Sequence, residues 1–172
     1  VKYDPALAVK ARAAGHEGWW YYANDQLAPH ANAFTDGQPI EQRLLMGAMA
    51  ARYRPDGFLY YQSSYFNSPK CVTFGPYTDW TPDSWSNQHG DATWMAVGPD
   101  GEPLTTQRLE NFRDGLEDLA YVKLAEAASG RPVKVPEPVF STLENFNDDP
   151  AAVEAWRDRL ADIIEGKGVE RE

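Results

Sequence analysis

The chain has little that would support disulfide, metal or phosphate chemistry. Cys71 is the only cysteine, so no disulfide can form within the chain. The three histidines, His16, His30 and His89, lack the spacing of metal ligands. No glycine-rich loop of the kind that cradles phosphates is present. The sequence therefore predicts no metal and no cofactor.

A long apolar run and a basic cluster are also missing. A membrane-spanning helix needs about 18 or more consecutive apolar residues, and the chain has no such run, so we expect no membrane insertion. The net charge of −10 would repel a phosphate backbone, which argues against nucleic acid as a partner. No signal peptide is visible. A lone cysteine fits a reduced compartment, but also an exported protein that needs no disulfides.

Aromatic residues, in contrast, are abundant. They make up 13% of the 172 residues and include six tryptophans and nine tyrosines. Such rings line sugar-binding sites, because the apolar face of a sugar can lie on them, and they also fill ordinary cores. Composition alone leaves both interpretations open.

Helix signals recur along the chain. Pro5 and Gly15 bracket a predicted helix over residues 5–14, and Pro39 opens a second over 39–54. In the second helix, Gly47 and its neighbouring alanines predict close packing on a sheet. A third helix is expected over 105–128, ending at Gly130 and Pro132, and a last helix begins after Asp148 or Asp149, with Pro150 in its first turn.

Three apolar segments, residues 19–23, 58–62 and 93–97, are predicted to be neighbouring parallel strands, since helices or a long loop separate them. Three strands cannot close a barrel, and an eight-stranded one takes roughly 200 residues or more. We therefore predict an α/β fold: the C-terminal portion of a (β/α)8 barrel over 1–130, followed by an extended link and a C-terminal helix over 131–172.

In such a barrel, sites form where strands end and in the loops that follow. The long segment 65–91 has no clear period, and segments of that kind are often functional. Trp19, Trp20 and Tyr60 lie in mid-strand and are expected in the core. The predicted sugar-contacting residues are those near the strand ends, in this loop and at the start of the third helix: Tyr22, Asn24, Tyr61, Gln62, Trp80, Trp85, Asp91, Arg108 and Glu110.

The third helix also has a purely structural interpretation. An apolar stripe runs along it, and Gly115 in its interior costs about 1 kcal/mol relative to alanine, which close backbone packing would explain. The charged residues Arg113, Asp114, Glu117 and Asp118 are expected to form a network that docks the helix. The stripe consists of Leu109, Phe112, Leu116, Ala120 and Leu124.

Five motifs, in order, resemble those of one enzyme family. The helix at 108–121 reads R-x-E-x-x-R-D-G-x-E-D-x-x-Y, the first strand contains W-W-Y, and residues 56–61 read D-G-F-L-Y-Y. The segment 40–44 reads I-E-Q-R-L, and Gly90-Asp91 precedes the third strand. Together they resemble the catalytic domain of glycoside hydrolase family 123 and a related bacterial domain of unknown function.

The resemblance implies a β-N-acetylgalactosaminidase-like enzyme, and it favours an exported location. In such enzymes the acetamido oxygen of the sugar attacks the anomeric carbon, and an adjacent Asp-Glu pair assists. The only adjacent acidic pairs here, Glu117-Asp118 and Asp148-Asp149, do not match that pair, so no catalytic residue is expected in this segment. The missing N-terminal barrel half or another subunit is the expected partner. A non-catalytic carbohydrate-binding module and a structural subunit are the alternatives.

Overall fold

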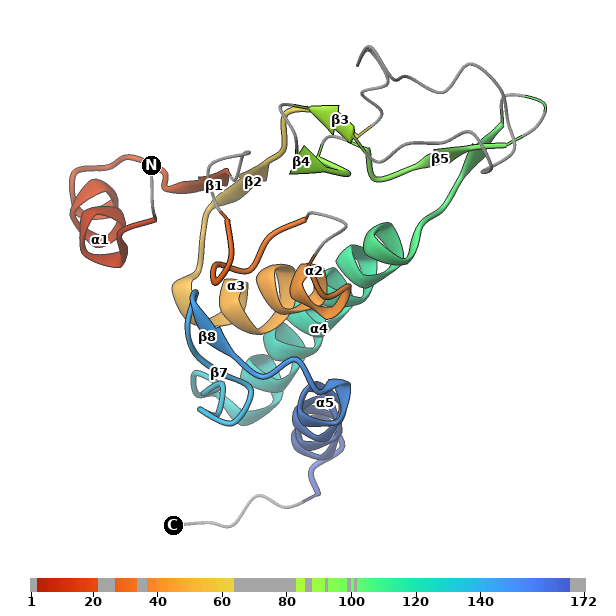
Figure 1. Cartoon of the computed structure of the whole chain (residues 1–172). Coiled ribbons are helices and arrows are strands. Elements are labelled where there is room, and N and C mark those ends of the chain that lie inside the picture. The colour runs from red at the N-terminus through yellow and green to blue at the C-terminus, as the bar shows by residue number, and fades with distance from the viewer. Residues whose placement is uncertain are drawn as a thin grey trace.

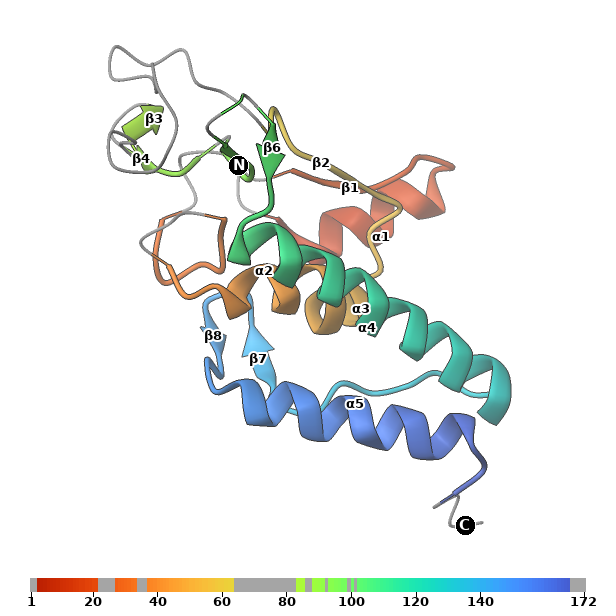
Figure 2. The ribbon, with the colours of Figure 1, turned by 90° about the vertical axis from the view of Figure 1, so that its right-hand side faces the viewer.

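The chain forms a mixed α/β structure with strands on both sides of a helical layer (Figure 1). In the computed structural model, β1 to β6 lie on one side of the helices α2, α3 and α4, while α5 and the hairpin β7–β8 lie on the other (Figure 1, Figure 2). The structure describes residues 3–21, 27–33, 37–63, 83–85, 88–91, 93–98, 100 and 102–167.

The parallel pairing of the first two strands is confirmed. Strand β1, Trp19–Tyr21, pairs in parallel with β2, Gly57–Leu59, and Trp20 lies opposite Phe58. The connection between them carries α2, Ile40–Leu44, a π-helical turn η1, Leu45–Met49, and α3, Ala50–Tyr53. These three segments correspond to the single helix predicted over 39–54.

The D-G motif at the start of β2 fits against β1. The Asp56 carboxylate accepts hydrogen bonds from the Gly18 N–H at 2.7 Å and from Arg12 of α1, Pro5–Ala13, at 3.1 Å, and these bonds lower the pKa of Asp56. A Cβ atom on Gly57 would lie 2.5 Å from the indole of Trp19. The motif therefore sets the register between β1 and β2.

Residues 93–97 were predicted to form a third parallel strand, and this predicted pairing is wrong. Strand β5, Ala96–Val97, instead pairs antiparallel with β6, Pro103–Leu104. The Gly98 N–H donates to the Glu102 carbonyl at 2.8 Å, so the chain turns back on itself here. At the end of the second predicted strand, the Ser63 carbonyl accepts the N–H groups of Trp94 and Met95.

Two glycines bring the central helices unusually close together. In α4, Gln107–Ser129, an added Cβ on Gly115 would lie 2.7 Å from the Arg43 carbonyl oxygen. One on Gly47 would lie 3.0 Å from the Cβ of Asp118. Close backbone packing at Gly115 is thus confirmed. The close partner of Gly47 is α4, however, and not a sheet as predicted.

The buried face of α4 differs from the predicted apolar stripe. Arg108, Gly115, Asp118, Val122 and Ala125 are the buried residues of the helix. Of the predicted stripe, Leu109 and Phe112 are half-buried, whereas Leu116, Ala120 and Leu124 are exposed, Leu116 by 43% and Leu124 by 54%. The prediction failed because a close glycine crossing and a buried ion pair, rather than apolar side chains, determine which side of α4 faces its neighbours.

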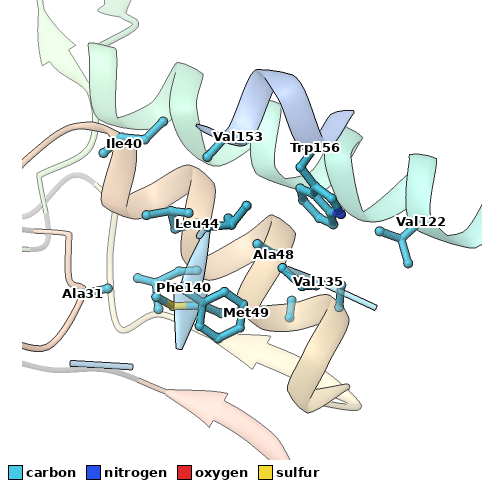
Figure 3. Close-up of a cluster of buried hydrophobic side chains, with 14 of the residues drawn as sticks. Ala31, Ile40, Leu44, Ala48, Met49, Val122, Val135, Phe140, Val153 and Trp156 are labelled. Carbon is cyan, nitrogen blue, oxygen red and sulfur yellow. The ribbon is translucent and has the colours of Figure 1, made fainter. Parts of the chain in front are cut away.

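The C-terminal segment completes the helical core. Strands β7, Phe140–Thr142, and β8, Asn145–Phe146, form a hairpin that leads into α5, Pro150–Ile164, with Asp149 as its N-cap. Side chains from α2 to α5 and from this hairpin make one apolar cluster, with Phe140 and Trp156 among its large members (Figure 3). Neither this hairpin nor β3–β4, Asp83–Trp85 with Gln88–His89, was predicted. Along the described chain, no helix has the length and apolar composition needed to cross a membrane.

A buried ion-pair network joins three helices. Asp118 is 0% exposed and accepts bonds from Arg43 of α2 at 2.7 Å and from Arg157 of α5 at 2.9 Å. Arg43 also pairs with Glu154 of α5. Arg113, Asp114 and Glu117 form exposed pairs on the α4 surface, and Glu117 also reaches Arg157. Among the charged residues predicted to dock the helix, Asp118 makes the buried contacts.

Replacing Asp118 by asparagine should destabilise the fold strongly. The substitution keeps the shape but leaves the buried charge of Arg43 poorly compensated, which costs about 3–5 kcal/mol. Urea unfolding followed by circular dichroism measures this loss. Asp114→Asn is the matched control on the same helix, because its surface pair with Arg113 should contribute less than about 1 kcal/mol. Equal losses in both variants would contradict the assignment.

Candidate functional site

The two faces of the parallel sheet have different surroundings. Trp20 and Phe58 point toward the helical layer, where Trp20 packs on Tyr3 and Tyr53 and Phe58 packs on Phe112. Trp19, expected in the core, is instead 56% exposed. The opposite face carries the exposed side chains of Trp19, Tyr21 and Leu59, and the exposed Tyr61 follows just beyond the end of β2. We call these four residues the aromatic face.

Tyr60, Asp91 and Trp94 form a packed unit just beyond the end of β2. The Tyr60 hydroxyl donates to the Asp91 carboxylate at 2.6 Å, and its ring stacks on Trp94 with centroids 4.3 Å apart. Trp94 also packs on Phe112 of α4 at 4.7 Å. Tyr60 had been expected only to fill the core. A tyrosine in an otherwise apolar strand was the signal for a hydroxyl that needs a partner.

Arg108 connects three separate segments at the start of α4. Its guanidinium donates to the carbonyls of Ala33 and Gly90, both at 2.6 Å, and to that of Thr93. Gly90 adopts a φ of +74°, a left-handed conformation that favours glycine. Arg108 is buried, so within the described structure it holds the chain segments that surround Asp91.

Glu41 and Gln42 anchor the segment that follows β1. The Glu41 carboxylate accepts the N–H groups of Asn32 at 2.9 Å and Gln38 at 2.8 Å, while the Gln42 amide donates to the Asn32 carbonyl at 3.1 Å. Burial raises the pKa of Glu41, and the two N–H donors partly oppose this shift. Within the I-E-Q-R motif, Glu41 and Gln42 thus hold a loop, and Arg43 binds Asp118.

The predicted site residues fall into three groups. Asp91 and Arg108 are brought together through the Gly90–Thr93 segment, and Tyr61 and Gln62 continue from Tyr60, with Tyr61 59% exposed and Gln62 half-buried. Glu110 accepts a bond from the Thr105 hydroxyl and pairs with Arg113. Residues that lie outside the described structure, in whole or in their side chains, are Tyr22, Asn24, Trp80 and Trp85.

Ring surfaces and polar groups follow one another at this end of the sheet. The aromatic face offers apolar ring surfaces, and Tyr61 and Gln62 add a hydroxyl and an amide at one end of it. Among the described residues, no three His, Cys, Asp or Glu side chains are grouped so that they could hold a metal ion.

Glu41→Gln should change how stability depends on pH. Because burial raises the pKa of Glu41, the folded protein holds this proton more tightly than the unfolded chain does. The proton on Glu41 therefore contributes its full stabilisation of the folded state below the ordinary glutamate pKa of about 4.3. This contribution is lost as the pH rises through the raised pKa of Glu41 in the folded protein. We expect the melting temperature of the wild type, relative to Glu41→Gln, to fall between about pH 4 and neutrality.

The exposed Glu137 supplies the control, since Glu137→Gln removes one negative charge without touching the buried loop. A difference between wild type and Glu41→Gln that stays constant across this pH range would contradict the role given to the Glu41 proton.

Comparison with known proteins agrees with these motifs. The model of the glycoside hydrolase 123 catalytic domain matches residues 2–125, which include β1, β2 and most of α4. A comparison with curated proteins gives no match. The family match covers well over half of the chain and all five motifs, and the chain therefore belongs to the glycoside hydrolase 123 catalytic-domain family.

Proposed function

We propose that this chain supplies the last βα units of a (β/α)8-barrel glycoside hydrolase acting on β-N-acetylhexosaminides, with β-N-acetylgalactosaminides as the first substrates to test. The observation that carries the proposal is the parallel β1–β2 pair, which has apolar side chains on both faces. One face packs on the helical layer, and the other is the aromatic face.

Parallel sheets normally have both faces covered. In a barrel, helices cover the outer face and the side chains of the other strands cover the inner face. The aromatic face suits that inner position, because it lies on the side of the sheet away from α2, α3 and α4. The carboxyl ends of the strands then carry Tyr61 and Gln62, where barrel enzymes hold their substrates.

The acid chemistry belongs elsewhere in such a barrel. In the proposed substrate-assisted reaction, the acetamido oxygen attacks the anomeric carbon, an aspartate orients the acetamido group, and a glutamate protonates the leaving oxygen. Within this chain, Asp118 is engaged in buried ion pairs and Asp149 caps α5. Neither adjacent acidic pair is therefore available, and other strands would supply the catalytic pair.

The residues of this chain have supporting roles in the proposal. Tyr61 and Gln62 contact the sugar, together with Tyr22, Asn24, Trp80, Trp85 and Glu110, and Asp91 and Arg108 hold the surrounding segments in place. The contacts of Arg108 with three carbonyls and of Asp91 with Tyr60 support this division.

Tyr61→Ala in the intact enzyme should weaken the reaction without unfolding the protein. Loss of one stacking ring is expected to lower kcat/KM by about tenfold. Tyr61→Phe is the matched control, since it keeps the ring and should stay near the wild type. Hydrolysis of an aryl N-acetyl-β-galactosaminide gives the measurement. Nitrophenol release by residues 1–172 alone would refute the assignment of the catalytic pair to other strands.

The open edge of β1 gives a second test. Within the described chain β1 pairs with β2 alone, and an unpaired edge beside exposed aromatic side chains is an aggregation hazard. We expect the remaining barrel strands, or another subunit, to complete it. Residues 1–172 on their own should therefore self-associate in gel filtration and light scattering. A soluble, cooperatively melting monomer would refute this expectation.

A further inference from the structure

A cavity that is open to solvent lies at the far end of α4 from Arg108. It has a volume of about 370 Å³ and is lined by Ser129 at the end of α4, by the segment 131–136 and by α5. The 23 residues of α4 separate the two ends by about 33 Å at the usual rise per residue. All of its lining residues lie beyond the family match, which ends at residue 125.

The cavity concentrates positive charge in an acidic chain. Arg131, Lys134 and Arg159 all line it, and none of the described lining residues carries a carboxylate. The structure records no ion pair of these three cations with any described carboxylate, whereas Arg43, Arg54, Arg113 and Arg157 are all paired. In a chain of net charge −10, three cations gathered without acidic partners favour an anionic ligand.

Trp156 forms part of the wall of the cavity. It lines the cavity and is 2% exposed, yet its indole N–H has no hydrogen-bond partner among the described residues. Figure 3 shows the ring edge that carries the nitrogen turned toward Val122, on the side where α4 runs to its end. The N–H thus faces Val122, which does not line the cavity, and within the described structure the indole nitrogens of Trp20 and Trp94 are buried without a partner in the same way, so the ring contributes an apolar surface to the cavity.

We propose that this cavity is a binding site for an acidic sugar, whose carboxylate or sulfate is held by Arg131, Lys134 and Arg159. The volume falls within the usual range of small-molecule sites, roughly 300–1,000 Å³. The apolar side chains of Pro136, Leu160 and Ile163 offer a surface for the sugar ring. The sugar part of this proposal rests on the proposed function, whereas the anion part rests on the cavity alone.

Calorimetric titration of the intact protein tests both parts, because it measures binding without turnover. The probes are glucuronic acid and N-acetylgalactosamine 6-sulfate, compared with neutral N-acetylgalactosamine and inorganic sulfate. We expect both acidic sugars to bind at least about tenfold more tightly than the neutral sugar, in a salt-dependent manner. Equal binding of acidic and neutral sugars would overturn the site. Inorganic sulfate binding as tightly as the sulfated sugar would overturn the sugar part.

Substitutions test whether the acidic sugars bind in this cavity. Arg159→Gln and Lys134→Gln should each weaken the acidic sugars by about fivefold, since each removes one exposed charge from the cavity. Lys123→Gln, on an exposed part of α4 outside the cavity, is the matched control and should bind like the wild type. Unchanged affinity in both cavity variants would overturn the proposal, whatever the outcome of the Tyr61 kinetics.

Discussion

The close crossing of α2–η1 with α4 is the contact on which the rest of the structure depends. Gly47 and Gly115 bring the two backbones together, and Asp118 lies beside the crossing with both carboxylate oxygens engaged by arginines. A side chain at Gly115 would separate the helices, and a neutral residue at 118 would leave buried positive charge. Through Arg157 the same carboxylate orients α5, so the position of one helix relative to another determines the packing of a third.

Many of the motif residues that link this chain to its family use their side chains to hydrogen-bond backbone groups. Arg108 bonds three carbonyls, Glu41 accepts two N–H groups, and Asp56 accepts one from Gly18. Buried backbone groups need partners, and long segments without regular structure can obtain them only from side chains. Arg108 and Glu41 thus fix loops near the proposed substrate end, whereas Asp56 fixes the opposite, amino-terminal ends of β1 and β2.

The sequence predicted what local chemistry controls. Caps and prolines marked the ends of the helices, continuous apolar runs marked β1 and β2, and Gly115 indicated close packing. Prediction from the sequence failed where contacts between residues distant in the chain determine the packing. Leu116 and Leu124 fit a helical stripe, but the Asp118 ion pairs turned the other side of α4 inward. Residues 93–97 resembled a third buried strand, but the turn after Val97 paired β5 with β6. Of the site, the motifs indicated Asp91 and Arg108, while the hydroxyl role of Tyr60 depends on a partner 31 residues away.

The Asp118 network also bears on where this protein can be cut or recombined. The family match ends at residue 125, yet Val122 and Ala125 share their core with Phe140, Val153 and Trp156. Ending the chain at the family boundary would strip Arg157 and Glu154 from the network and open that core to water. A shuffled or truncated gene that respected only the boundary would encode an unstable product. The tail after α4 must therefore be inherited together with the helices that it covers.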